Sequence, residues 1–216
     1  MSAMDVERKD MRKTVYMVLL VLVLISMPAA FNFQSTKALV EISANVDVYS
    51  DVLNLVSKGT WLSVYIELPE GYDVNNISVS TVMLNDTVSA NASMVIGDYD
   101  NDTIPDAMVL FDRSEVITFI AGQNITFGNV ILTVSGELKD GTAFVGSDEV
   151  GVSSLMGDVN CDGTVDILDI IGASLSYGLE EGEAGWNANA NFAPPYNKVD
   201  LMDVVTIAAH YGESIS

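Results

Sequence analysis

The hydrophobic pattern begins with a polar, basic stretch and an uncharged apolar run. Residues 1–13 are polar and basic, residues 15–25 carry no charge, and small residues close the segment at 26–30. A basic start, an apolar stretch of about a dozen residues and a small-residue end are typical of a secretory signal. We therefore predict a signal peptide or membrane anchor over residues 1–31, and an extracellular or cell-surface location for the rest.

Short apolar runs alternate with Gly, Asn and Asp turns through the middle of the chain. The runs rich in Val, Ile, Thr and Tyr are predicted as strands: Leu39–Val48, Trp61–Leu68, Ile77–Leu84, Ala107–Phe111, Val130–Glu137 and Ala143–Val150. In Trp61–Leu68 one set of alternate positions is aliphatic throughout, which is typical of a half-buried antiparallel strand. No stretch with helical spacing interrupts the runs. The pattern predicts a mainly β domain over residues 32–152, an immunoglobulin-like sandwich.

The pattern changes after residue 152, where acidic loops precede apolar positions at helical spacing. A repeat is evident: Asp166, Asp169, Tyr177 and Gly178 recur as Asp200, Asp203, Tyr211 and Gly212. Such a repeat predicts two copies of one loop–helix unit. Because one copy alone cannot bury its apolar face, we expect the two to pack about a pseudo-twofold axis in a small helical domain over residues 153–216.

The composition limits the kinds of binding site that the chain can form. The chain has 30 acidic against 9 basic residues, a formal net charge of −21, which disfavours nucleic-acid binding because phosphate contacts depend on basic side chains. Apolar residues make up 49% of the chain, so a core can form. A single His and a single Cys exclude a His- or Cys-rich zinc site. The abundant carboxylate and amide oxygens suit hard cations, above all Ca²⁺.

The first loop of the repeat, GDVNCDGTVDILD, has the spacing of an EF-hand-like calcium loop. Gly163 stands at position 6, where the sharp turn needs a residue without a Cβ. The candidate ligands at positions 1, 3, 5, 7, 9 and 12 are Asp158, Asn160, Asp162, the Thr164 carbonyl, Asp166 and Asp169.

The second loop of the repeat departs from this pattern. Asn191 stands at the expected first ligand position, and Asp200 and Asp203 keep positions 9 and 12. Residues 193–195 replace the other side-chain oxygens, although backbone carbonyls such as that of Tyr196 can substitute. With fewer carboxylates, we expect weaker calcium binding here.

A third acidic loop, GDYDNDTIPDAMVLFD, lies within the predicted β domain. Its candidate calcium ligands at positions 1, 3, 5, 7 and 9 are Asp98, Asp100, Asp102, the Ile104 carbonyl and Asp106. Thr103 replaces the usual Gly at position 6, and Val109 replaces an acid at position 12. The alternative is an acidic turn exposed to solvent without an ion.

The C-terminal repeat resembles dockerin domains over residues 157–213, in its first loop, in the linking Trp186-Asn187 segment and in the Tyr-Gly pair that ends each copy. Dockerins bind cohesin modules to build extracellular assemblies, often ones that degrade polysaccharides. The resemblance implies a cohesin-like partner and partner contacts at loop positions 10 and 11, which are Ile167, Leu168, Leu201 and Met202. The alternative is that these four residues belong to the apolar core.

The middle segment resembles a β-sandwich module found beside dockerin repeats in archaeal cell-surface proteins. The stretches IGDYDNDTIPDAMVLFDRS and GELKDGTAFVGSDEV carry this resemblance. It implies a structural or carrier module without catalysis. Asn-x-Ser/Thr sequons in this segment fit an exposed, glycosylated domain; they lie at Asn76, Asn85, Asn91, Asn101 and Asn124.

The remaining distinctive residues are interpreted as structural. Cys161 at loop position 4 is expected to be exposed, with an intermolecular disulfide as the alternative. His210 is expected to cap or pack at the end of a helix. Trp61 and Trp186 are interpreted as core or docking aromatics rather than as a sugar-binding platform, because neither stands in a cluster of aromatic residues in the sequence.

These observations favour a calcium-binding adaptor that docks to a cohesin-like protein and is not an enzyme. The alternative is a non-catalytic carbohydrate-binding or scaffold component of a polysaccharide-degrading complex, with a cell-surface glycan or polysaccharide as ligand. A small hydrolase with two catalytic acids is disfavoured, because the clustered acids are already assigned to metal loops. Membrane contact is expected only through the N-terminal segment.

Overall fold

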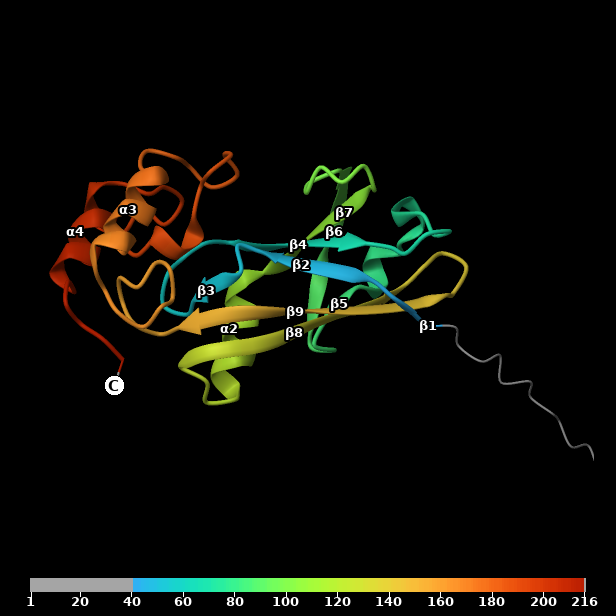
Figure 1. Cartoon of the computed structure of the whole chain (residues 1–216), viewed down its shortest axis with the longest axis horizontal. Coiled ribbons are helices and arrows are strands. Elements are labelled where there is room, and N and C mark those ends of the chain that lie inside the picture. Colours follow the sequence, from blue (N-terminus) through green and yellow to red (C-terminus); the bar gives the residue numbers. More distant parts are fainter. Residues whose placement is uncertain (1–40, 216) are drawn as a thin grey trace, which may run out of the picture. The chain divides into compact units, whose positions relative to one another are not determined.

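The computed structural model describes residues 41–215 (Figure 1). The predicted signal or anchor lies outside these residues. These residues belong to one compact unit. Within the described residues, no helix has both the length and the apolar character needed to cross a bilayer. We call residues 41–153 the β-module and residues 154–215 the C-terminal module.

The β-module is mainly β, as predicted. Its strands are β1 (Glu41–Ser43), β2 (Asn45–Tyr49), β3 (Val52–Asn54), β4 (Trp61–Glu67), β5 (Met83–Leu84), β6 (Val88–Gly97), β7 (Asp106–Asp112), β8 (Phe127–Glu137) and β9 (Ala143–Ser153). The strands pair in the order β1-β9-β8-β5-β6-β7-β4-β2, and β3 pairs with β9.

β1 and β2 stand at opposite ends of this strand order, and Ala44 joins them directly in the chain. The sheet is therefore nearly closed. β1 runs parallel to β9, whereas β2 runs antiparallel to β4. The Ala44 N–H donates to Val145 O (2.8 Å), and the Val48 N–H donates to the Asp148 carboxylate (2.8 Å). The prediction of one continuous strand over Leu39–Val48 is therefore wrong, since its two halves belong to different strand pairs.

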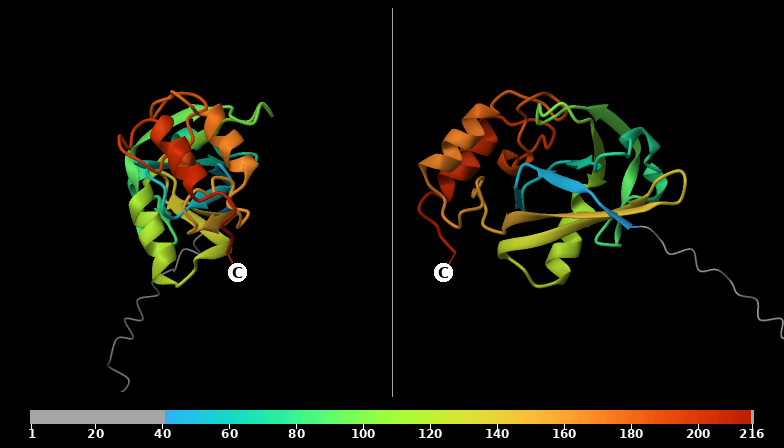
Figure 2. Two further views of the ribbon diagram at one scale, coloured as in Figure 1. Left: turned by 90° about the vertical axis from the view of Figure 1, so that its left-hand side faces the viewer. Right: turned by 45° about the vertical axis from the view of Figure 1, so that its right-hand side comes forward.

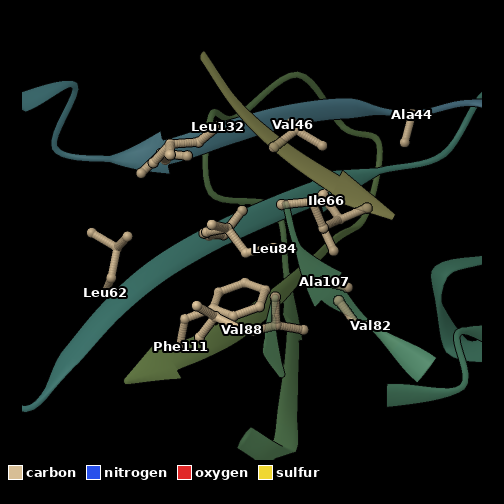
Figure 3. Packing of buried hydrophobic residues seen from close by; sticks show 14 of the residues in the cluster. Ala44, Val46, Leu62, Ile66, Val82, Leu84, Val88, Ala107, Phe111 and Leu132 are labelled. Atoms are coloured by element: carbon tan, nitrogen blue, oxygen red, sulfur yellow. The ribbon is translucent and has the colours of Figure 1, made fainter. Parts of the chain in front are cut away.

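Alternation along β4 builds the core of the β-module. Leu62, Val64 and Ile66 are buried, while the residues between them are half-buried, which confirms the predicted half-buried strand. Figure 3 shows these side chains meeting others from β5, β7 and β8, including Leu84, Phe111 and Leu132.

Three expectations for the β-module are wrong. A helix, α2 (Arg113–Gly122), interrupts the strands, with the Asp112 carboxylate capping it by accepting from the N–H groups of Ser114 and Glu115. Within the predicted strand Ile77–Leu84, only Met83–Leu84 forms a strand, β5, and Val79–Thr81 forms a 3₁₀ turn, η2, which follows another 3₁₀ turn, η1 (Val74–Asn76). The ten-residue strand β6 was not predicted.

The C-terminal module consists of two similar loop–helix copies, as predicted. α3 (Ile167–Leu175) and α4 (Leu201–Ala209) pack side by side (Figure 2), and a 3₁₀ turn, η3 (Ala188–Ala190), precedes the second loop. The copies exchange equivalent hydrogen bonds: Gly212 N–H donates to Val165 O, and Gly178 N–H donates to Val199 O, each at 2.8 Å. The module has its own apolar cluster, which includes Val165, Val199 and Ile207.

Candidate functional site

The first C-terminal loop, residues 158–169, wraps around the carboxylate of Asp158. This fully buried side chain accepts from the N–H groups of Asp162 (3.1 Å) and Gly163 (3.0 Å). Asn160 Oδ1 accepts from Asp162 N, and Asp162 Oδ1 accepts from Thr164 N. Gly163 has φ of +88°, the left-handed conformation expected at the sharp turn. The loop therefore gathers the predicted ligand positions 1, 3 and 5 within one short bend.

Asp169 closes this loop. Its Oδ1 accepts from the N–H of Val159 (2.7 Å) and its Oδ2 from that of Asp166 (2.8 Å). Asp166 in turn caps α3 by accepting from Leu168 N–H. The acids at positions 9 and 12 thus tie the start of the loop to the start of the helix, so an ion in the loop would also fix the position of α3.

The second C-terminal loop, residues 191–203, has the same closure. Asp203 accepts from the N–H groups of Phe192 (2.7 Å) and Asp200 (2.7 Å), and Asp200 caps α4. Asn191 is fully buried and its Oδ1 has no hydrogen-bond partner, while its Nδ2 lies 2.6 Å from Tyr196 O. A buried carbonyl oxygen without a donor is costly. A cation beside Asn191 Oδ1 would satisfy this oxygen.

The loop of the β-module, residues 98–106, repeats the hydrogen bonds of the first C-terminal loop position by position. Thr103 N–H donates to Asp98 Oδ2 (3.2 Å), Asp102 N–H to Asp100 Oδ1 (3.1 Å) and Ile104 N–H to Asp102 Oδ1 (2.7 Å). Thr103 has φ of +80°, so it adopts at position 6 the conformation that Gly163 adopts in the other loop. The bend forms without glycine.

Two further carboxylates complete this cluster. Asp106, only 5% exposed, accepts from Tyr99 N–H (2.8 Å), and its oxygen lies within 4.8 Å of oxygens from Asp98 and Asp100. Glu67 on β4 comes equally close to Asp100 and Asp102. Sequence reasoning missed Glu67, because only the pairing of Glu67 with Asp106 between β4 and β7 brings it to the loop.

Burial and mutual repulsion disfavour the ionised form of these acids. Burial raises the pKa of Asp106, and the neighbouring Asp100 and Asp102 raise it further. Burial also raises the pKa of Glu67, with Asp102 as the nearest contributing charge, and burial raises the pKa of Asp158. A bound divalent cation would remove this repulsion.

These shifts predict the pH dependence of the metal-free protein. Acids whose pKa is higher in the folded state favour folding when they are protonated. We therefore expect the melting temperature in chelator to rise as the pH falls from about 7 toward the ordinary carboxyl pKa, which is 3.8 for Asp. Below that value Asp73 and Asp112, whose pKa values hydrogen bonds lower, lose charge and stability falls. A melting temperature that declines steadily from neutral pH would contradict this.

The four predicted partner residues are exposed, so their assignment to the apolar core is wrong. Ile167, Leu168 and Met202 are each 53% exposed and Leu201 is 61% exposed. Further along the same helices, other apolar side chains are also exposed: Ile171, Leu175 and Val205. We call this set of seven residues the helical apolar face. Exposed apolar side chains gathered on two neighbouring helices are typical of an interaction site.

Cys161 is buried, contrary to the prediction. It is 8% exposed, and burial raises the pKa of its thiol to about 12. The loop packs against the β-module, and this contact covers the side chain. A protonated, covered thiol is unsuited to nucleophilic chemistry or to an intermolecular disulfide.

His210 is the C-cap residue of α4, and its Nδ1 lies 3.0 Å from the Glu213 carboxylate.

A buried polar cluster connects the β-module to both C-terminal loops, and sequence reasoning missed it. Asn54 Nδ2 donates to the carbonyl of Asp158 (2.7 Å), and Lys58 N–H donates to the carbonyl of Asn191 (2.7 Å). Arg113 donates to Asn54 O and to Asn189 Oδ1. The first residue of each C-terminal loop, Asp158 or Asn191, therefore accepts a hydrogen bond from the β-module.

The interpretation of Trp61 as an aromatic without aromatic neighbours is wrong. It lines a cavity together with Tyr49, Tyr65 and Tyr99, and Trp186 lines the same cavity. Among the sequons, Asn76, Asn101 and Asn124 are exposed, while Asn85 and Asn91 are half-buried.

Comparison with models of known families, with curated proteins and with solved structures finds no match.

Proposed function

We propose that this protein is a dockerin-like, calcium-binding adaptor that joins a cohesin-like partner in an extracellular or cell-surface assembly. The observation that carries the proposal is the first C-terminal loop, whose backbone N–H groups already organise Asp158, Asn160 and Asp162 in the order an EF-hand-like loop requires. In this proposal the β-module is an immunoglobulin-like spacer or carrier, and the protein is not an enzyme.

Calcium is the cation that the ligands favour. All candidate ligands are oxygens, and carboxylates, an amide and backbone carbonyls together suit the flexible coordination of Ca²⁺. In the first loop they are Asp158, Asn160, Asp162, Thr164 O, Asp166 and Asp169. The second loop offers fewer carboxylates, and the loop of the β-module adds Glu67 to its own acids. We propose one ion in each of the three loops.

The ions would prepare the docking surface. Each C-terminal loop ends at the N-cap of a helix, Asp166 for α3 and Asp200 for α4. An ion that fixes the loops therefore fixes the direction of both helices and the helical apolar face that they carry. Calorimetric titration of the metal-stripped protein with Ca²⁺ tests the proposal, since it counts the sites. Failure to bind Ca²⁺ at millimolar concentration would overturn it.

Docking is predicted to depend on the helical apolar face. Leu168→Asp and Leu201→Asp each place a charge on an exposed apolar position, so they should weaken binding to a cohesin-like partner at least about tenfold. Because both side chains face solvent, the melting temperature should change little. Surface plasmon resonance with the immobilised partner measures the first effect, and thermal melts measure the second. Ile131→Asp, at an exposed apolar position of β8 outside the helical apolar face, serves as the control and should leave binding unchanged.

A further inference from the structure

Aromatic rings line a groove that adjoins the acidic loop of the β-module and that the docking function does not use. Two adjoining cavities, of about 290 and 610 Å³, share Tyr49, Tyr65 and Tyr99 in their walls. The smaller reaches the loop of the β-module at Asp100, and the larger reaches Trp61 and the segment around Trp186. We call the two together the tyrosine groove.

The rings of the groove are held in place before any ligand arrives. Tyr65 and Tyr99 lie with ring centroids 4.5 Å apart, and Tyr49 meets Tyr65 edge-on at 6.3 Å. The Tyr99 ring also lies over Gly97, where a Cβ would come within 2.8 Å of it. Tyr49 is nevertheless 53% exposed and Tyr99 39% exposed. Rigid rings with open surface cost little conformational entropy on binding.

The polar groups of the groove are mainly hydrogen-bond acceptors. At its narrow end they belong to Asn45, Asp47, Glu67, Asp100 and Asp106. Among the lining residues in the described part of the chain, Arg113 is the only basic one, and it is 2% exposed. Carboxylate acceptors without accessible cations repel an anionic ligand and favour one that brings many hydroxyl donors.

We propose that the tyrosine groove binds a neutral polysaccharide chain. The C–H faces of sugar rings pack on aromatic faces, whose π-electrons carry negative charge, while sugar hydroxyls donate to Asn45 and Asp47 at the narrow end, which are not among the calcium ligands. The rings follow one another along the groove, which suits a ligand with a repeated unit. Pockets that combine apolar walls with a few placed polar groups are typical ligand sites.

A basic peptide is the competing occupant, because its cations would also suit rings and carboxylates. Most of the acids, however, lie at the narrow end beside the loop of the β-module. A Ca²⁺ ion in that loop, a step that rests on the proposed function, would neutralise Asp100 and Asp106. The wide end is lined by the uncharged polar residues Ser50, Ser63 and Asn187, and its two acids, Glu181 and Glu183, already accept hydrogen bonds from the N–H groups of Thr60 and Glu180. The neutral ligand is therefore the better match.

The test is titration of the full-length, calcium-loaded protein with neutral hexasaccharides of glucose, mannose and N-acetylglucosamine, followed by calorimetry. We expect at least one to bind, and Tyr49→Ala and Tyr99→Ala each to raise its Kd about tenfold. Tyr72 is the matched control, because it is 39% exposed like Tyr99 but lies outside the groove. Thermal melts of each variant establish that it is folded.

Several results would overturn the proposal. They are no binding of any neutral hexasaccharide, equal binding of hexagalacturonic acid, binding of hexalysine alone, or the same loss of affinity in Tyr72→Ala. The Leu168→Asp variant separates this proposal from docking, because it should lose the cohesin-like partner and keep the sugar. Calcium titration without sugar reports separately on the metal loops.

Discussion

Chelation of calcium is expected to lower the melting temperature of the C-terminal module by about 10 °C or more, since a ligand at 100 times its Kd contributes about 2.7 kcal/mol per site. The cause is the repulsion of the Asp158 carboxylate by Asp169 and Asp162 of the same loop, which an ion offsets only in the folded state. Scanning calorimetry with calcium and with excess chelator measures the shift.

Variants localise this effect to the first loop. Asp158→Ala removes a fully buried carboxylate that two backbone N–H groups need, and Asp166→Ala removes both a candidate ligand and the cap of α3. Each should lower the melting temperature and shrink the difference between calcium and chelator. Glu70→Ala, an exposed acid outside the loops, should preserve the difference. Identical melting of the unmodified protein in calcium and chelator would contradict the prediction.

Sequence reasoning succeeded where the determining interactions are local. Alternation along β4 was evident in eight residues, because burial of every second side chain is a property of a single strand. The turns of the acidic loops follow from spacing, since each carboxylate accepts from N–H groups only a few residues away. The capping acids Asp166 and Asp200 likewise act within their own helices.

Prediction failed where distant segments decide the outcome. α2 carries apolar residues around its circumference, with Val116 and Ile120 buried and Ile117 and Phe119 packed at the edge of the core, so no one-sided periodicity marked it as a helix. Its start signal, Asp112 followed by Glu115, was present but weak beside so many β-branched residues. Strand β6 was not predicted because its register with β7 shifts between Ala90 and Met94, which interrupts the alternation of apolar and polar residues.

The candidate sites show the same division. Spacing identified the three acidic loops as candidate metal sites, yet Glu67 reaches one of them only through strand pairing. The tyrosine groove combines Tyr49, Tyr65 and Tyr99 from three separate segments, so no short motif could reveal it. Exposure of Leu168 and Leu201 depends on how α3 and α4 pack together, and apolar spacing alone could not separate the helical apolar face from the core.

Arg113 has an unusual environment for a charged residue. It is 2% exposed, and burial lowers the pKa of its guanidinium to about 10. Its donors reach Asn54 O (3.0 Å), Ser57 Oγ (2.7 Å) and Asn189 Oδ1 (2.9 Å). These partners are neutral, so the guanidinium is held by a cage of hydrogen bonds that joins the β-module to the C-terminal module.

Arg113→Ala is therefore expected to lower the free energy of unfolding by about 3 kcal/mol, because it leaves a cavity and buried acceptors without their donors. Arg113→Lys should recover only part of the loss, since all three hydrogen bonds come from Nη2, a position that the shorter lysine side chain does not fully reach. Calcium affinity of the first loop should fall as well, because the same cluster holds the carbonyl of Asp158 through Asn54. Urea unfolding and calcium titration measure the two effects, with Lys139→Ala, an exposed cation, as the control. Normal stability with unchanged calcium affinity in Arg113→Ala would show that the cluster does not couple the modules.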